Sequence, residues 1–134
     1  MAAPNILAAT SIYGKSVGAT LTTTDTTDIL TCGSGKVLKV KTIIVSNVDG
    51  SNNASATVYF YDSSATDRYA LASTINVPAD ASLVVLGDNS ILYLEEGDQI
   101  EAGSSGSNDL DIVISYEELS DAWPWDTMVQ FEEN

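Results

Sequence analysis

Apolar and polar side chains alternate with a period of two along most of this chain, and that period constrains the fold more than any other feature. Successive side chains of a β-strand point to opposite faces, so the alternation is typical of strands that bury one face. Residues 110–116 show it most clearly. Leu110, Ile112 and Ile114 share one predicted face, and Val113 lies on the other. The period therefore indicates a fold built from half-buried strands.

Clusters of Gly, Asn, Asp and Ser separate these alternating runs, and such residues favour turns because they adopt or stabilise turn backbone conformations. No segment before Ser120 shows a 3.6-residue apolar stripe, so the crossover helices that a parallel sheet needs are missing from the pattern. The sequence predicts an all-β fold, an antiparallel β-sandwich of jelly-roll type. The predicted strands are residues 5–13, 17–23, 28–31, 37–46, 54–61, 68–75, 81–86, 90–95, 98–102 and 109–117.

The last residues differ in character from the rest, so we predict a β-sandwich domain over residues 1–119 and an extended, acidic, aromatic C-terminal arm over residues 120–134. The arm holds both tryptophans of the chain and has no Lys or Arg. Large apolar side chains are costly to leave in water, so they are expected to dock on this subunit's own sandwich, or on a neighbouring subunit or partner protein. A basic or neutral surface would suit such an arm. The predicted partner-binding residues of the arm are Trp123, Trp125, Met128 and Phe131.

The predicted strand 37–46 breaks the simple alternation. If Leu38 and Val40 face the core, strict alternation places Ile43 and Val45 on the solvent face. Either a β-bulge changes the register within the strand, or another subunit covers this outer face. On the second interpretation Ile43 and Val45 are candidate partner-binding residues.

Composition excludes several function classes. The chain has 134 residues, a net charge of −14 and no histidine. Nucleic-acid binding needs clustered Lys and Arg against phosphates, and histidine is the commonest general base and metal ligand. No apolar run approaches the roughly 18 residues of a membrane span. We therefore expect no enzyme activity, no cofactor, and neither nucleic-acid nor membrane binding.

Individual motifs add little chemistry. Residues 33–36, Gly-Ser-Gly-Lys, lack the other glycine and the Ser or Thr of a phosphate-binding loop. The Asp49 loop lacks the glycine and glutamate of an EF-hand, although its carboxylates leave calcium binding open. Cys32 is the only cysteine and is interpreted as a buried apolar filler. Tyr59 and Tyr61 are expected to point outward, where they could stack on sugar rings.

Residues 37–119 resemble small virion structural proteins of tailed marine bacteriophages, especially those of cyanobacterial hosts. The resemblance implies a β-sandwich that assembles in the host cytoplasm and enters the virion in many copies. It implies a capsid decoration or cement subunit, a homo-oligomer expected to be a trimer, that binds the major capsid protein or other virion proteins. The alternative is a neck, tail or fibre component, or an adhesin for host glycans. The stretches that carry the resemblance are residues 41–50, 58–62, 74–86, 92–98 and 114–119.

Overall fold

A computed structural model describes residues 11–120 of the chain, and every regular element in that range is a β-strand. The long strands coincide with the alternating runs of the sequence, and turns rich in Gly, Ser, Asn and Asp connect them. The prediction of an all-β fold is confirmed. The strands are β1 (Ser11–Leu21), β2 (Thr27–Thr31), β3 (Lys36–Asn47), β4 (Ala54–Asp62), β5 (Asp67–Val77), β6 (Ser82–Leu86), β7 (Leu92–Leu94), β8 (Gln99–Ser104) and β9 (Leu110–Ser120).

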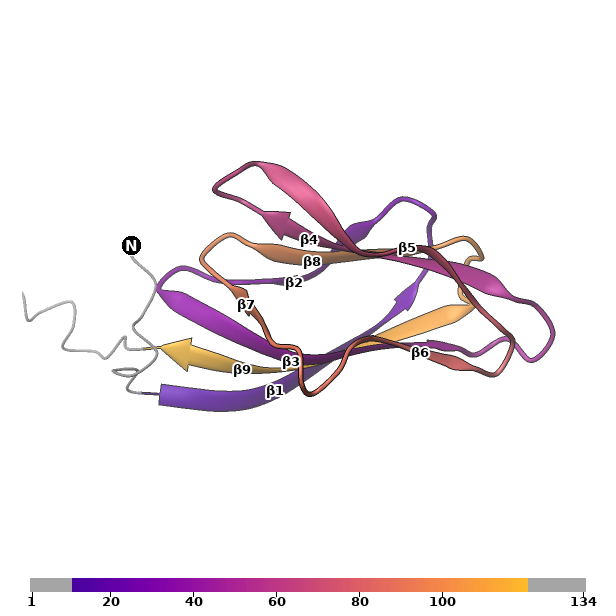
Figure 1. Ribbon diagram of the computed structural model, residues 1–134, viewed down its shortest axis with the longest axis horizontal. Coiled ribbons are helices and arrows are strands. Elements are labelled where there is room, and N and C mark those ends of the chain that lie inside the picture. The colour runs from indigo at the N-terminus through magenta and orange to yellow at the C-terminus, as the bar shows by residue number, and fades with distance from the viewer. Residues whose placement is uncertain (1–10, 121–134) are drawn as a thin grey trace, which may run out of the picture.

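The strands form two antiparallel sheets that pack face to face (Figure 1). Sheet A has the order β1-β9-β3-β6, with β7 also paired to β3, and sheet B has the order β2-β8-β4-β5. The first strand lies beside the last, and the second lies beside the last but one. This nesting is the connectivity of a jelly roll, with β7 added to its eight strands. The predicted jelly-roll sandwich is confirmed.

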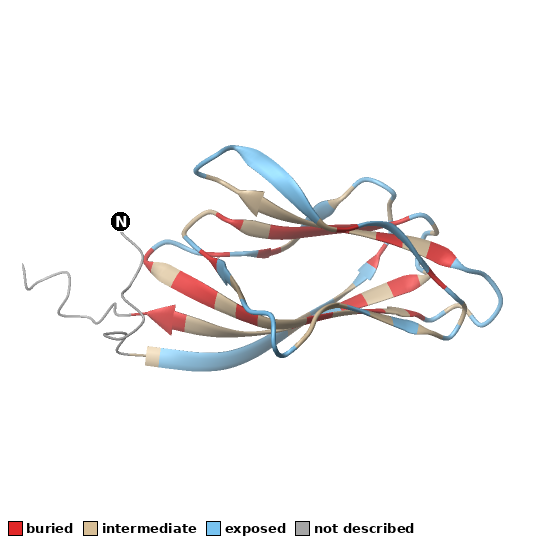
Figure 2. Cartoon of the chain, in the orientation of Figure 1, coloured by how far each residue is buried: buried red, intermediate tan, exposed pale blue. Residues whose placement is uncertain are grey.

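The core lies between the sheets and is filled by the inward side chains of both. Along β9, Leu110, Ile112 and Ile114 are fully buried, while Val113 between them is exposed, as the alternation predicts. In sheet B, Ala56 and Val58 are fully buried too. Buried residues alternate with less buried ones along the central strands (Figure 2). The interior is therefore assembled from one face of each strand.

The strand β3 contains a β-bulge, and the bulge corrects one prediction. Val40 pairs with Tyr116 and Thr42 pairs with Ser115, so Lys41 is an extra residue in β3. The extra residue shifts the side-chain parity, and Ile43 and Val45 point into the core with no exposed surface. The interpretation of Ile43 and Val45 as an exposed contact face is wrong, and the alternative interpretation, a change of register, is confirmed.

The strand β1 also differs from expectation. The sequence predicts a break between residues 13 and 17, but β1 runs without interruption from Ser11 to Leu21, paired along its whole length with β9. Gly14 weakens the strand signal locally, yet backbone pairing with β9 overrides that preference. Residues 5–10 of the first predicted strand and residues 121–134 of the arm lie outside the described residues, so the division into a sandwich domain and an arm stays a prediction.

Buried polar groups in the turns have specific partners. The side-chain amide of Asn47 donates to the carbonyl oxygens of Asn52 and Val77, both at 2.9 Å. The carboxylate of Asp98 accepts from the backbone N–H groups of Ser63 at 3.0 Å and Glu95 at 2.9 Å. Burying a polar group costs free energy unless it is hydrogen-bonded, so these contacts fix the turns at the two ends of the sandwich.

Candidate interaction surfaces

The outer face of sheet A carries a row of apolar side chains that crosses three neighbouring strands. Val113 of β9 pairs with Ile44 of β3, and Ile44 pairs with Val84 of β6. Val113 is 46% exposed and Val84 is 61% exposed, although both are β-branched residues in regular strands. We call Val113, Ile44 and Val84 the apolar row. On the β1 side, Gly18 pairs with Val113 and has no side chain to cover it, which leaves a shallow hollow beside the row.

The polar side chains on both sides of the apolar row are small and hydrogen-bond one another. Each pair joins neighbouring strands, so these groups already have partners before any other molecule approaches. Covering the serine and threonine hydroxyls costs little, because a hydroxyl that keeps its hydrogen bond loses little on leaving water, whereas the Asp111 carboxylate carries a charge. The pairs are Ser16 with Ser115 at 3.2 Å, Thr20 with Asp111 at 2.8 Å, and Ser46 with Ser82 at 2.9 Å.

Lysines lie at the end of sheet A where β9 finishes. The Lys39 ammonium lies 4.0 Å from the Glu117 carboxylate. Lys41 sits in the bulge between the inward Val40 and Ile43, and among residues 11–120 no carboxylate lies within ion-pair distance of it. Lys41 and Thr42 together oppose Ser115 between the inward Val40 and Ile43, so the bulge directs Lys41 toward the outer face. A negative group on this face would therefore find an unpaired cation.

A carboxylate at the same end of the sheet is shared by two lysines. Glu118 accepts from Lys15 at 3.1 Å and lies 3.0 Å from the Lys36 ammonium, and its side chain is only 13% exposed. Burial alone raises the pKa of Glu118, but the hydrogen bonds and charges of Lys36 and Lys15 outweigh it and bring the pKa below its usual value. The hydrogen bond to Glu118 also raises the pKa of Lys15. This triad ties β1, β3 and β9 together.

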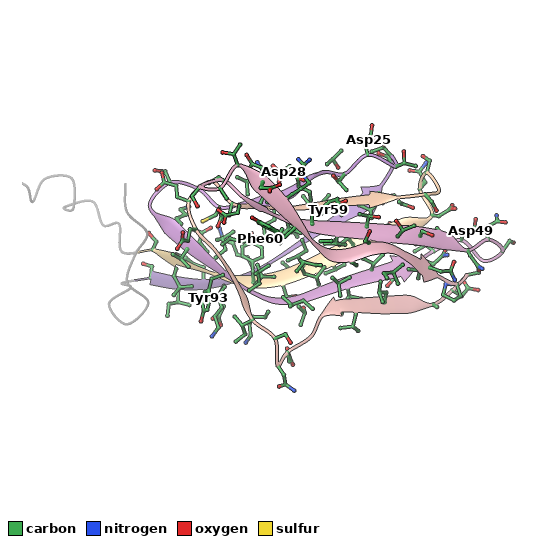
Figure 3. The ribbon with its side chains drawn as sticks, turned by 45° about the horizontal axis from the view of Figure 1, so that its top comes forward. Asp25, Asp28, Asp49, Tyr59, Phe60 and Tyr93 are labelled. Carbon is green, nitrogen blue, oxygen red and sulfur yellow. The ribbon has the colours of Figure 1, made fainter. Side chains whose placement is uncertain are left out.

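The outer face of sheet B carries an aromatic and charged cluster. Arg68 of β5 lies over the rings of Tyr59 and Tyr61, 5.9 Å from each ring centroid, and its Nε donates to Glu101 at 2.9 Å. In Figure 3, Asp28 and Tyr59 lie on the side of sheet B, and Tyr93 lies on the opposite side of the molecule. The guanidinium occupies a position that a stacked sugar ring would need. Sugar binding at Tyr59 and Tyr61 stays a prediction, and this arrangement does not favour it.

Next to that cluster, sheet B has a small hollow of about 150 Å³ lined by hydroxyl groups and backbone. Gly103 is one of the lining residues, and a side chain there would be crowded, because a β-carbon would approach the carbonyl oxygens of residues 23–25 at 3.0–3.1 Å. None of the residues that line the hollow is charged, so they supply neither a general base nor an activated nucleophile. The lining residues are Thr24, Ser55, Thr57, Thr74, Gly103, Ser104 and Ser105.

The single cysteine is inert in this fold. Cys32 is buried and its thiol approaches the carbonyl oxygen of Lys36 at 3.2 Å. Burial raises its pKa to about 11, so almost no thiolate exists at neutral pH. The prediction that Cys32 is a buried filler is confirmed.

Within residues 11–120, no three Cys, Asp or Glu side chains of the acidic loops lie close enough together to hold a metal ion. The Asp49 carboxylate instead accepts from the backbone N–H of Ser51 at 2.8 Å and the side-chain amide of Asn52 at 3.0 Å. The hydrogen bonds from Asn52 and Ser51 lower the pKa of Asp49. This carboxylate therefore stabilises the turn after β3. The same part of the chain contains no helix long and apolar enough to cross a membrane.

The structure brings together residues that the sequence did not single out. Ile43 and Val45 are core residues, and the predicted arm residues fall in 121–134, outside the described range. The apolar row becomes visible only when strand register aligns Val113, Ile44 and Val84. A signal was present in the sequence, since Val113 is an apolar residue on the predicted outer face of its strand. The predicted partner-binding residues of the arm stay a prediction; they are Trp123, Trp125, Met128 and Phe131.

Comparisons with known proteins give structural likeness only. No family model matches the chain, and no curated protein matches it. A structure of the acidic stable capsid of Helicobacter pylori bacteriophage KHP30 matches with a TM-score of 0.48 and 8% identity, over 85% of this chain and 91% of that chain. A pentameric capsid protein isolated from metagenomic phage sequences matches with a TM-score of 0.31 and 16% identity, over 88% of this chain and 74% of that one. Likeness of this degree does not establish a family.

Proposed function

We propose that this protein is a phage virion structural protein, a subunit that decorates or cements the capsid through contacts with other subunits. The observation that carries the proposal is the outer face of sheet A. Its centre is the apolar row, exposed at Val113 and Val84 and half-buried at Ile44, flanked by small polar groups that already hydrogen-bond one another, on a chain whose net charge is −14. Interface centres are depleted in charge and packed with apolar side chains, so this face fits a protein partner. That the partner belongs to a phage particle is suggested by the resemblance of residues 37–119 to virion structural proteins of tailed bacteriophages.

A jelly roll by itself does not choose between functions, since capsid proteins, lectins and enzymes share it. The described surface favours a structural role for a chemical reason. The hydroxyl-lined hollow on sheet B has no charged group, and Arg68 lies over the two outward tyrosines. Neither site offers the catalytic pair or the free aromatic platform that the other functions require. The proposed partners are copies of this chain, in a homo-oligomer proposed to be a trimer, and the major capsid protein or other virion proteins.

The cement role is tested on particles of the phage that encodes the protein, with and without its gene. If the subunit bridges shell proteins, the binding free energies of its many contacts add up over the shell and stabilise it. Particles that lack the subunit should then release their DNA at a lower temperature. Gentle heating with a dye that binds released DNA measures this. Equal release temperatures would reject the cement role. A location at the neck, tail or fibre in electron micrographs of labelled particles would replace it with the alternative.

A host-glycan adhesin makes a different prediction for the isolated protein. A ligand that binds only the folded state raises the melting temperature as its concentration rises. We expect no shift with glycans from the host envelope. A saturable increase in melting temperature that Tyr59→Ala abolishes would show glycan binding, and would contradict the proposal that this protein acts only through protein contacts.

A further inference from the structure

The apolar row needs an occupant that is itself apolar. Val113 and Val84 are both about half exposed or more, and Gly18 leaves the side of Val113 open. Besides Gly18, the hollow is lined by Ala19, Thr20, Asp111, Ile112 and Val113, and the Thr20 hydroxyl already donates to the Asp111 carboxylate at 2.8 Å. A flat strand would bridge this hollow without filling it. A bulky side chain that projects from a partner segment would fill it and bury Val113 at the same time.

The part of this face between the apolar row and Ser120 favours negative charge in its occupant, whereas Asp111 lies on the other side of Val113. Lys39 and Lys41 lie on β3 between the apolar row and the end of β9 at Ser120. Lys39 has only a long contact of 4.0 Å to Glu117, and Lys41 has no carboxylate within ion-pair distance in the described range. The occupant is therefore expected to combine large apolar side chains with Asp or Glu and no basic residue.

Residues 121–134 have this composition. They contain two tryptophans, a methionine, a phenylalanine and four carboxylates, with no Lys or Arg. They follow directly on Ser120, the last residue of β9. Fully extended, 14 residues reach about 45 Å, and Val113 lies seven residues, about 23 Å, before Ser120 along β9. The segment is long enough to reach an apolar row.

The direction of β9 favours the row of another copy. The strand runs from Leu110 to Ser120, so the chain leaves sheet A pointing away from Val113. Docking on the same copy would require the chain to turn back along β9, whereas a copy placed beyond the end of β9 would be reached without a reversal. We propose that the outer face of sheet A binds residues 121–134 of a neighbouring copy, with an aromatic side chain beside Gly18 and carboxylates at Lys39 and Lys41. This inference deepens the proposed function and rests on it.

Each copy then gives one segment and receives one. Such a head-to-tail contact is heterologous, and it closes into a ring where the rotation between copies permits. A closed ring satisfies every apolar row at once, which fits a subunit that occurs in many copies on a symmetric shell.

Two full-length variants test the exchange. Trp123→Ser/Trp125→Ser keeps the face and loses the aromatic side chains, and Val84→Glu keeps the segment and places a charge in the apolar row. Each alone should sediment as a monomer where the unaltered protein sediments as an oligomer. Mixed together, they should form a pair of twice the monomer mass, because one intact segment can still bind one intact face. Val48→Glu is the matched control, since Val48 is 54% exposed in the loop after β3, and it should leave the oligomer unchanged.

Tryptophan fluorescence follows the same mixture. Both tryptophans of the chain lie in residues 121–134, so the double variant is silent and every signal comes from the Val84→Glu partner. Adding the silent variant should shift that emission to the blue and reduce acrylamide quenching severalfold. The inference is overturned if the mixture sediments as monomers and the tryptophan emission does not shift. It is also overturned if the unaltered protein sediments as a monomer, or if the Val84→Glu variant alone sediments as an oligomer. If Val84→Glu does not melt cooperatively, Gly18→Leu, which fills the hollow, replaces it.

The virion assay separates this inference from the proposed function. Particles that incorporate the Trp123→Ser/Trp125→Ser protein normally, with a normal DNA release temperature, would overturn the exchange and leave the structural role intact. Absence of even the unaltered protein from purified particles would reject the structural role, whatever the mixing experiment shows.

Discussion

At the residue scale, Glu118 forms ion pairs with two of the few basic side chains of this acidic protein. Two of the five basic residues, Lys15 and Lys36, meet at this one carboxylate, whose side chain is only 13% exposed. A partly buried carboxylate with two charged hydrogen-bonding partners contributes more than an exposed ion pair, because solvent screens it less. The triad therefore joins the edge strand β1 to the centre of sheet A.

We expect Glu118→Gln to lower the free energy of unfolding by about 1–2 kcal/mol at pH 7. The folded state lowers the pKa of Glu118 below its ordinary 4.5, so the folded protein binds this proton less tightly than the unfolded chain. The contribution is therefore complete above about pH 4.5 and is lost as pH falls below that value. Thermal melts across this range measure the effect, and the gap between the two proteins should close in acid.

Glu95→Gln is the matched control, because the Glu95 side chain is exposed. It should leave the unfolding free energy within about 0.5 kcal/mol of the unaltered protein. A gap between Glu118→Gln and the unaltered protein that widens in acid would contradict the assigned pKa direction.

The neighbouring residues Ile43 and Ile44 make a second test at this scale. Ile43 is fully buried, whereas Ile44 lies in the apolar row on the outer face. Ile43→Ala should cost about 2–5 kcal/mol through lost burial and the cavity it leaves. Ile44→Ala removes the same atoms from a half-covered site and should cost under about 1 kcal/mol in the monomer. Urea unfolding measures both, and equal losses would mean that the parity of β3 is misassigned.

At the scale of elements, one residue sets the register of half a strand. Lys41 is the extra residue of β3, and the residues on either side of it obey opposite parities. Leu38 and Val40 point inward before the bulge, and Ile43 and Val45 point inward after it. A bulge is thus what reconciles two apolar runs that strict alternation would place on opposite faces.

Deleting Lys41 should therefore be far more damaging than deleting a loop residue. The shortened strand would turn either Leu38 and Val40 or Ile43 and Val45 out of the core, and a one-residue slip exchanges every side chain between faces. We expect loss of the cooperative melting transition. Deleting Asn89, exposed in the turn after β6, should leave cooperative melting in place. A Lys41 deletion that melts like the parent would show that the bulge is dispensable.

The strands β1, β3 and β9 also show which features of the fold can be predicted from the sequence alone. Alternation predicts β9 and its faces because a single strand carries that pattern. It does not locate the bulge at Lys41, since bulges depend on pairing with β9, and it breaks β1 at Gly14–Ser16, where pairing with β9 sustains the strand. The apolar row is a property of three strands in register, so no window of the sequence contains it. The Arg68–Glu101 contact likewise depends on strand pairing in sheet B.

At the scale of the whole molecule, the charge is unevenly distributed. Four of the five basic residues lie on β1 and β3 of sheet A, and only Arg68 lies on sheet B. The net charge of −14 repels other copies at long range, so association must occur where charge is lowest or opposite. The apolar row beside Lys39 and Lys41 is such a place. This distribution favours one defined contact over nonspecific aggregation.

The same distribution predicts that the protein does not bind duplex DNA, even if it covers a shell that contains DNA. Binding to phosphates requires several free Lys or Arg side chains, and here Lys15, Lys36, Lys39 and Arg68 each lie within 4.0 Å of a carboxylate. A gel-shift assay at roughly 150 mM salt should therefore show free DNA at every protein concentration, because counterion release contributes almost nothing. A retained band that weakens steeply with added salt would show that Lys41 and its neighbours form a phosphate-binding surface, and the charge argument would then be wrong.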